Sequence, residues 1–436
     1  MSDGAQLACS LVEPDGTPPT GGWPALMLFH GLGGNHGEVL EPVAVQYLAP
    51  AGYATLECDA RGHGQSGGLF GLDGPRDVQD TRELFTWLTA RPEISDTQIG
   101  AYGYSLGGGA VWNATAAGVP FKAIAPSITW TSLKTALEPQ ALSKSGLVQY
   151  LAALVPVARW DPDLLAGKDA WTTSEASNAV NMLTAARSVA PRLATISTPT
   201  FLIQGRHDFL FDIDQALAAY KAVHGPKRLY VGDLGHLPAP NPIAEQAVIY
   251  GELVKWFDHY VRGVPNGVQA LAPIELAHDP WDGKTTSYKA LPTTKTISVA
   301  LPGNTTMSGS GGKVVRSVRV TGGPHETFGD STITVPYSGA KTWDHLVAVL
   351  TVAGSATPIS VGGIKFSAES GTATIKLMNE AVRIPAGKKL VLYLSSTSLA
   401  QDPGDALYIA AVQPGAQITI GRATLKLSVL TKAVSR

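Results

Sequence analysis

Three polar residues, far apart in the chain, have the types and the order that acyl transfer needs. Ser105 lies in Gly103-Tyr-Ser-Leu-Gly107, between an apolar run that predicts a strand and an alanine-rich run that predicts a helix. A serine in Gly-x-Ser-x-Gly at such a junction forms a nucleophile elbow, a sharp and strained turn that exposes the hydroxyl. Gly103 and Gly107 are needed because a Cβ at either position would clash with the neighbouring elements. We therefore predict that Ser105 is a nucleophile.

Asp208 and His236 follow Ser105 in the order nucleophile, acid, histidine, as an elbow of this type requires. Each comes just after a strand-like run: Asp208 after 198–205, and His236 after 228–231. Each motif is weak alone, but the order and the positions at strand ends agree. We predict that His236 is the general base and that Asp208 orients and stabilises its imidazole.

A tetrahedral intermediate also needs hydrogen-bond donors for its oxyanion. The run 23–29 predicts a buried strand, and the sequence His30-Gly-Leu-Gly-Gly34 turns away from its end. We predict that the backbone N–H groups of Leu32 and Leu106 hold the oxyanion, the second at the positive end of a helix. His30 precedes the turn, so we expect it to brace this loop by hydrogen bonds.

Other charged residues near these motifs have structural interpretations. Asp212 and Asp214 are close enough to compete with Asp208, but Asp212 precedes an amphipathic run and has the features of a helix N-cap. Asp59 and Arg61 lie in a glycine-rich loop after a strand-like run. We expect these two residues to form an ion pair or hydrogen bonds within the loop.

The motifs together resemble those of the CocE/NonD hydrolases, relatives of the X-Pro dipeptidyl-peptidases. The resemblance includes the Asp-x-Arg-Gly-x-Gly-x-Ser-x-Gly loop at 59–68, the elbow, and the later Asp and Gly-His. The runs 344–352 and 383–393 are similar to strands of that family's C-terminal jelly roll. The resemblance covers nearly the whole chain and implies an α/β-hydrolase fold with a helical cap insertion, followed by an all-β jelly-roll-like sandwich. It also implies a catalytic triad, made of the three residues named above, that hydrolyses esters or amides.

The chain departs from this family in two places. Cocaine-esterase-like members use a tyrosine hydroxyl in the oxyanion hole where this chain has Leu32, so we predict a hole made of main-chain groups. The expected cap, at about 129–193, has no acidic cluster that can be assigned to the N-terminal amine of a peptide substrate. Three tryptophans are candidates for an acyl or aromatic pocket, with burial in the core as the alternative for each: Trp130, Trp160 and Trp171.

The hydrophobic periodicity changes once along the chain. Up to residue 262, buried strand-like runs alternate with amphipathic runs, which predicts an α/β sheet covered by helices. After 263–267, short runs rich in Val, Ile and Thr between Gly, Ser and Pro turns predict a β-sandwich. The predicted division is an α/β-hydrolase domain over 1–262, including the cap, a linker over 263–272 and a sandwich over 273–436.

Composition limits the possible partners. The chain has 436 residues, more than one core usually holds, and its 16% of charged residues and net charge of -2 leave no basic stripe for nucleic acid. We expect neither nucleic acid nor a membrane surface as a partner. Cys9 and Cys58 have no metal-ligand spacing and are interpreted as small buried residues that form no disulfide framework. We predict no metal and no cofactor.

The sequence carries no predicted targeting or membrane segment. No apolar run approaches the roughly 20 residues that span a bilayer, and the first residues lack the basic-then-apolar pattern of a signal peptide. The chain as written is expected in the cytoplasm, or outside it if a leader was removed. Compartment and oligomeric state stay open.

The motifs predict a serine hydrolase that acts through an acyl-enzyme on a small-molecule ester or a short peptide. The first hypothesis is a carboxylesterase for small to medium acyl groups. The alternatives are an aminopeptidase, X-Pro dipeptidyl-peptidase or acylpeptidase, a polyester-acting hydrolase, and a catalytically degenerate binding protein. Jelly rolls also bind carbohydrates and polymers, but the aromatic residues after 272 are scattered. We therefore prefer a sandwich that completes the wall of the active site.

Overall fold

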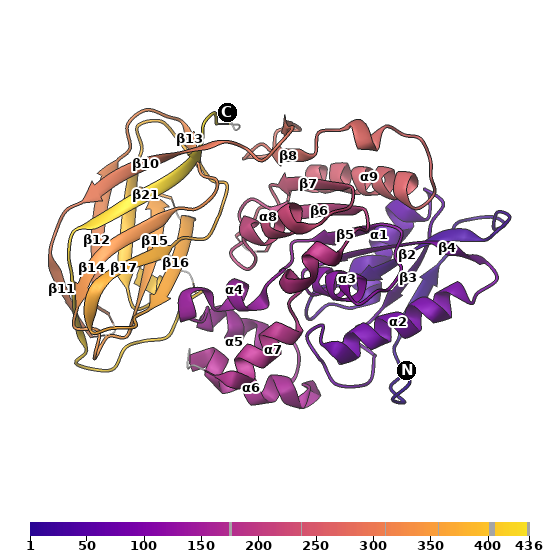
Figure 1. The fold of residues 1–436 in the computed structure, drawn as a ribbon, viewed down its shortest axis with the longest axis horizontal. Helices are drawn as coiled ribbons and strands as arrows, with labels where there is room; N and C mark the ends of the chain where they lie inside the picture. Colours follow the sequence, from indigo (N-terminus) through magenta and orange to yellow (C-terminus); the bar gives the residue numbers. More distant parts are fainter. Residues whose placement is uncertain (174–176, 237, 310, 356, 401–405, 434–436) are drawn as a thin grey trace.

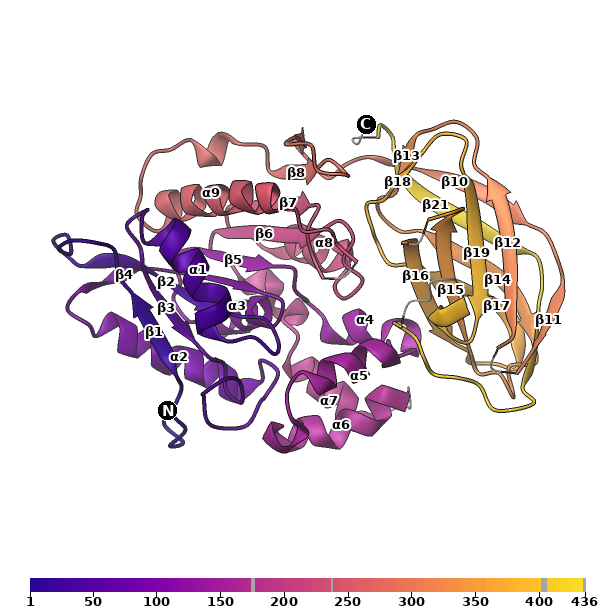
Figure 2. The same ribbon diagram turned by 180° about the vertical axis from the view of Figure 1, so that it is seen from behind.

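The computed structural model describes residues 1–173, 177–236, 238–309, 311–355, 357–400 and 406–433. It has an α/β part, a helical part and an all-β part (Figure 1). The helical part lies against the boundary between the other two, as the view from behind also shows (Figure 2). No helix in these described ranges is long and apolar enough to cross a membrane.

A nine-stranded sheet forms the α/β part, in the order β1-β3-β2-β4-β5-β6-β7-β8-β9. The strands from β3 across to β8 are parallel, and β1 and β9 are antiparallel at the two edges. This is the predicted α/β-hydrolase arrangement. The strands are β1 Cys9–Val12, β2 Trp23–Phe29, β3 Ala54–Cys58, β4 Ile94–Tyr104, β5 Ile124–Ser127, β6 Thr200–Gly205, β7 Lys227–Gly232, β8 Ile274–Ala277 and β9 Thr285–Tyr288.

Helices cover both faces of this sheet, and the interior strand β2 shows why. Successive side chains of a strand point to opposite faces. Ala25 and Met27 belong to the core beneath α2, α3 and α8, whereas Leu26 and Leu28 belong to the core beneath α9. The helices are α1 Glu41–Val43, flanked by π-helical turns at His36–Leu40 and Ala44–Leu48, α2 Pro75–Thr89, α3 Leu106–Ala116, α8 Ile213–Ala222 and α9 Ile243–Tyr260.

The boundary predicted at residue 262 is wrong, because β8 and β9 belong to the first sheet. After α9, a short 3-10 turn at Val268–Ala270 leads into β8, which pairs in parallel with β7. The segment 263–272 is thus a connection within the α/β part, which extends to Tyr288. The hydrophobic periodicity gave the wrong boundary because a short strand near a sheet edge has the same composition as a strand of a sandwich.

The helical cap insertion lies between β5 and β6. Its apolar side chains pack on one another and on Leu106, Leu210 and Phe211 of the α/β part. The cap therefore closes over the end of the sheet where the elbow lies. Its elements are α4 Leu133–Leu137, α5 Ser145–Ala153, α6 Pro162–Thr173 and α7 Asn178–Ala186, with 3-10 turns at Pro139–Ala141, Val157–Arg159 and Ala190–Thr195.

Two facing sheets form the all-β part, and a small two-stranded sheet lies at its edge. The larger sheet runs β10-β21-β14-β20-β11 with β17 paired to β14, and the smaller runs β12-β19-β15-β16. The strands are β10 Thr294–Leu301, β11 Thr305–Ser308, β12 Lys313–Arg319, β13 His325–Glu326, β14 Thr332–Ser338, β15 His345–Val352, β16 Pro358–Lys365, β17 Ser370–Lys376, β18 Arg383–Ile384, β19 Lys389–Ser395, β20 Gln417–Ile420 and β21 Ala423–Leu430. A 3-10 turn occupies Ser398–Ala400.

Strand β15 shows that the sandwich is packed on both faces. Leu346 and Ala348 point into the core between the two sheets. Val347 and Val349 point the other way and cluster with Leu142 of the cap, among other apolar residues. This second buried layer attaches the sandwich to the rest of the molecule.

Polar contacts reinforce the same interface. The segment Asn379–Ala381 runs beside the loop after β6: Ile213 N–H donates to Asn379 at 3.1 Å, and Ala381 N–H donates to Arg206 at 2.9 Å. Arg206 also pairs with Glu326 of the sandwich, and both side chains are fully buried. A buried ion pair with backbone partners on both sides favours one fixed orientation of the two parts.

The interpretation of the cysteines as small buried residues is wrong. Cys9 and Cys58 form a disulfide, with Cα atoms 4.0 Å apart. They are direct partners in the antiparallel pairing of β1 with β3, and Cys9 is exposed. The sequence hid this pairing because it depends on the register of two strands separated by 49 positions.

Candidate active site

Ser105 lies on a strained turn between β4 and α3, as predicted. Its backbone has φ 55° and ψ -120°, a conformation that residues with a Cβ rarely adopt. A Cβ on Gly103 would overlap the backbone of Gly107, and one on Gly107 would overlap the backbone of Phe29. Both glycines are thus required for the turn to pack against β2.

The structure brings Ser105, His236 and Asp208 into one hydrogen-bonded chain. His236 Nε2 is 2.8 Å from Ser105 Oγ, and His236 Nδ1 is 2.9 Å from Asp208 Oδ2. A carboxylate only accepts, so Nδ1 carries a proton and Nε2 is free to accept the proton of the serine. Asp208 is completely buried and also accepts the backbone N–H groups of His236, Leu210 and Phe211. These bonds hold the carboxylate toward the imidazole.

The two competing acids face the sandwich instead. Asp212 is at the N-cap position of α8, but its Oδ2 accepts Asn379 N–H at 3.1 Å instead of a helix N–H. Asp214 accepts hydrogen bonds from the side chains of Lys376 and Asn379. Of these three aspartates, Asp208 lies within hydrogen-bonding distance of the imidazole of His236.

Two buried charged residues support the loop of Asp208, and the sequence analysis missed both. Lys144 of the cap donates to the carbonyl oxygens of Phe209 and Leu210 at 3.0 and 3.2 Å. Glu380 of the sandwich accepts Asp208 N–H at 3.0 Å. Burial lowers the pKa of Lys144, and burial with Asp212 and Asp208 nearby raises the pKa of Glu380 well above its ordinary value. No local motif marks these residues, because their partners come from distant segments.

The two predicted oxyanion donors lie close to the nucleophile. Leu106 is the first residue of α3, directly after Ser105. The loop of Leu32 touches the elbow, since a Cβ on Gly31 would lie 3.5 Å from Ser105 Cβ. Within the described ranges, neither Leu32 N–H nor Leu106 N–H donates a backbone hydrogen bond. Both N–H groups therefore stay candidates for the oxyanion site.

A cavity of about 730 Å³ opens beside Ser105 and His236. All three parts of the molecule line it: α/β loops, helix α5 of the cap, and sandwich residues including Thr357 and Leu407. Its described lining contains no Asp, Glu, Lys or Arg. The uncharged residues around it include Leu32, Ile128, Leu147, Tyr150, Leu151, Leu154, Phe209, Leu210, Pro238, Pro358 and Ala406.

None of the three candidate tryptophans is among the described lining residues of this cavity, which favours the alternative of burial in the core. Trp130 is buried, packs on Phe211 and donates Nε1–H to the carbonyl of Arg187 at 2.7 Å. Trp160 and Trp171 line a separate cavity of about 60 Å³ between the cap and the loops below it. The packing of the cap turns all three rings into its own core.

His30 and Asp59 form loop hydrogen bonds as expected, whereas Arg61 forms its ion pairs outside its own loop. His30 Nε2 accepts Ala60 N–H at 2.9 Å, and His30 Nδ1 is 2.7 Å from the carbonyl oxygen of Gly31. Burial lowers the pKa of His30. Asp59 accepts the backbone N–H groups of His36 and Gln65, both at 2.8 Å. Arg61 pairs with aspartates outside the loop, Asp80 and Asp3.

Comparison with known sequences points to one family of hydrolases. Residues 3–238 match the model of a family described as X-Pro dipeptidyl-peptidase (S15 family). A Streptomyces avermitilis protein, whose name proposes a Xaa-Pro dipeptidyl-peptidase, is 26% identical over 317 residues, 65% of this chain and 44% of that protein. An uncharacterised 31.7 kDa protein of Escherichia coli is 36% identical over 94 residues, 21% of this chain and 32% of that protein. The chain thus spans less than half the length of each relative.

Solved structures share the fold over the whole chain. A CocE/NonD family hydrolase from Staphylococcus aureus has a TM-score of 0.76 at 14% identity, covering 99% of this chain and 92% of that one. An aminopeptidase from a marine sediment archaeon, Thaumarchaeota archaeon, has a TM-score of 0.71 at 12% identity, covering 99% and 95%. At these identities the likeness is one of fold, and it confirms the predicted resemblance and architecture.

Proposed function

Because the chain belongs to the X-Pro dipeptidyl-peptidase (S15) family of hydrolases, we propose that it cleaves carboxylic esters with apolar acyl groups. Ser105 is the nucleophile, His236 the general base and Asp208 the acid. The observation that carries this proposal is the serine-histidine-aspartate chain beside a cavity whose described lining contains no Asp, Glu, Lys or Arg.

The first half of the reaction forms an acyl-enzyme. Ser105 Oγ attacks the carbonyl carbon of the ester while His236 Nε2 takes the hydroxyl proton. The carbonyl oxygen becomes an oxyanion that accepts the N–H groups of Leu32 and Leu106, and one such donor contributes about 3–4 kcal/mol in comparable sites. As the C–O bond to the alcohol breaks, His236 gives its proton to the leaving oxygen. The acyl group remains on Ser105 as an ester.

The second half uses water in place of the serine. His236 Nε2 takes one proton from the water, and the resulting hydroxide attacks the acyl carbon. The second tetrahedral intermediate collapses, Ser105 Oγ leaves, and His236 returns the proton to it. Asp208 holds the ring through Nδ1–H in both halves and stabilises the imidazolium.

The cavity favours an apolar acyl chain. Leu147, Leu151 and Leu154 of the cap line it, and so do Phe209 and Leu210 of the loop after β6. Each methylene buried there contributes about 0.8 kcal/mol, so kcat/KM is expected to rise roughly fourfold per methylene until the cavity is filled. A charged acyl group would lose its hydration without gaining a partner from the described lining.

A series of p-nitrophenyl esters, from acetate to laurate, tests the proposal. We expect hydrolysis by the wild type that rises with acyl length, and none above background by Ser105→Ala. A fluorophosphonate probe is expected to label the wild type and leave Ser105→Ala unlabelled. Ester turnover retained by a folded Ser105→Ala protein would refute the assignment of the nucleophile.

The second candidate is a peptidase, favoured by the family match and by the name of the Streptomyces relative. An X-Pro dipeptidyl-peptidase must bind the charged N-terminal amine of its substrate, and a carboxylate is the group suited to that task. The described lining of the cavity offers no carboxylate, which is why we place this function second. A higher kcat/KM for an Ala-Pro p-nitroanilide than for every ester in the series would reverse the order.

A further inference from the structure

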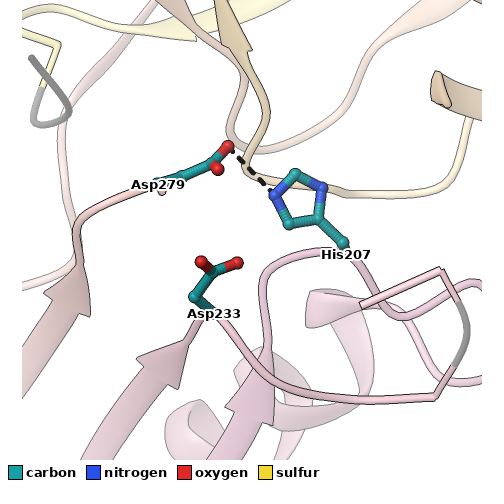
Figure 3. A group of neighbouring side chains, drawn as sticks. All are labelled: His207, Asp233 and Asp279. Atoms are coloured by element: carbon teal, nitrogen blue, oxygen red, sulfur yellow. Dashed lines mark hydrogen bonds and ion pairs between the residues drawn. The ribbon is translucent and has the colours of Figure 1, made fainter. Parts of the chain in front are cut away.

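Outside the triad, His207, Asp233 and Asp279 bring three metal-ligating side chains together (Figure 3). They follow the ends of β6, β7 and β8, and these strand ends are adjacent because β7 pairs with both neighbours. One ligand atom from each side chain lies within 4.8 Å of the other two. The sequence contains no spacing that indicates this group, since each member comes from a different loop.

Asp233 has a buried oxygen that no neighbour satisfies. Its Oδ2 accepts Trp281 N–H at 3.0 Å. Its Oδ1 is buried and has no hydrogen-bond partner in the part of the chain that the structure describes. Figure 3 shows this carboxylate pointing toward Asp279 and His207. A buried carboxylate oxygen is unfavourable without a donor or a cation, and Asp233 is only 1% exposed.

The other two side chains already face each other across this space. His207 Nε2 lies 3.0 Å from Asp279 Oδ2. Asp279 also accepts the backbone N–H of Arg383. An imidazole nitrogen and a carboxylate at this separation need only small side-chain rotations to share an ion.

The two carboxylates of the group lie close to each other and near Arg206. Arg206 attracts both carboxylates, but its guanidinium forms a buried ion pair with Glu326 and donates to two backbone carbonyls. Glu326 already pairs with Arg206, so an ion between Asp233 and Asp279 would lower the repulsion between these two carboxylates.

We propose that His207, Asp233 and Asp279 bind one divalent transition-metal ion of the zinc type. One imidazole nitrogen and two carboxylate oxygens form a ligand set that Zn²⁺ accepts, with water completing the coordination. His207 directly precedes Asp208, and Asp233 is three residues before His236. The ion would therefore tie together the loops of the proposed acid and base. This role is structural and separate from the proposed ester hydrolysis, whose mechanism uses no metal.

Zn²⁺ binding to the full-length protein tests this proposal directly. After treatment with a chelator and dialysis, titration calorimetry and metal analysis are expected to show one Zn²⁺ per chain, with an upward shift of Tm. Asp279→Asn and His207→Gln are each expected to weaken binding at least about tenfold. Asp282→Asn is the matched control, because Asp282 pairs with His278 at 3.1 Å in the same β8 to β9 connection. It should bind Zn²⁺ like the wild type.

Two outcomes overturn the proposal: no stoichiometric Zn²⁺ in the wild type, or binding that Asp279→Asn and His207→Gln leave unchanged. If a variant does not fold, the test uses the wild type with bound Co²⁺ and measures its proton NMR spectrum. Co²⁺-shifted imidazole proton resonances from a histidine ligand support the site. Stoichiometric Co²⁺ without such resonances overturns it.

Discussion

Asp208→Asn tests the triad at its most constrained member. The substitution keeps the shape of the side chain but turns one acceptor oxygen into an NH₂ donor. In the structure, Asp208 Oδ1 accepts the N–H groups of Leu210 and Phe211, both at 3.0 Å. Oδ2 accepts His236 N–H at 3.1 Å and faces His236 Nδ1 at 2.9 Å. In either orientation of the asparagine amide, its NH₂ group therefore faces N–H donors that the carboxylate of Asp208 accepted.

The orientation that keeps both Oδ1 bonds turns the new NH₂ group toward His236. Nδ1 must then accept, so the ring proton moves to Nε2, which can no longer take the proton of Ser105. The wrong tautomer lowers kcat about 10⁴-fold in a comparable triad, which corresponds to an activation free energy higher by about 5 kcal/mol. Because Asp208 is fully buried, the lost charge-assisted bonds also lower the free energy of unfolding, by about 1.5–3 kcal/mol each.

The assay compares kcat on p-nitrophenyl butyrate for Asp208→Asn and Asp212→Asn. Asp212 is the matched control, since it accepts Asn379 N–H at the sandwich interface and forms no hydrogen bond with His236 in the described part of the chain. Thermal unfolding of both variants separates lost catalysis from lost folding. A near-normal kcat in Asp208→Asn, together with a large loss in Asp212→Asn, would refute the reasoning and reassign the acid.

Four further predictions follow from individual residues. Ser105→Ala is expected to lower kcat about a million-fold without changing the circular dichroism, and residual turnover above about one per cent would place the nucleophile elsewhere. Burial raises the pKa of Glu57 to about 8 from an ordinary 4.5. The folded state therefore disfavours the ionised carboxylate, and the free energy of unfolding should fall as pH rises through this window, by up to about 1.4 kcal/mol per unit. Denaturant titrations of Glu57→Gln should lack this fall, and a pH profile identical to the wild type would contradict it. The Cys9–Cys58 disulfide, with a sequence separation of 49, is expected to contribute about 4 kcal/mol, so equal Tm values with and without reductant would argue against it. Truncation after Tyr288 removes one wall of the cavity and exposes the apolar interface with the cap, so the fragment should be insoluble or inactive. A soluble fragment with full activity on p-nitrophenyl esters would show that the sandwich is dispensable.

The sequence alone predicted the elements that depend on local chain geometry. Gly-x-Ser-x-Gly between a strand run and a helix run encodes a turn that only small neighbours permit, and the φ of 55° at Ser105 agrees with it. Asp208 and His236 could be placed near this serine because both follow parallel strands, whose ends meet at one edge of a sheet. Periodicity likewise predicted an α/β part followed by a β-sandwich.

Local pattern could not decide which distant segments pair. Strand β8 has the composition of a sandwich strand, and only its hydrogen bonds to β7 assign it to the first sheet. Cys9 and Cys58 meet because β1 and β3 pair in one particular register. Trp160 and Trp171 join the apolar cluster of the cap, whose members come from segments that are distant in the sequence.

The tertiary structure alone decided what supports the site and what shapes its cavity. Lys144 and Glu380 reach the loop of Asp208 from the cap and from the sandwich, because a buried polar group needs hydrogen-bond partners and distant segments supply them here. His207, Asp233 and Asp279 converge for the related reason that three strands end side by side. The sequence therefore determined the chemistry available at Ser105, whereas the packing of three parts of the chain determined the space that an acyl group can fill.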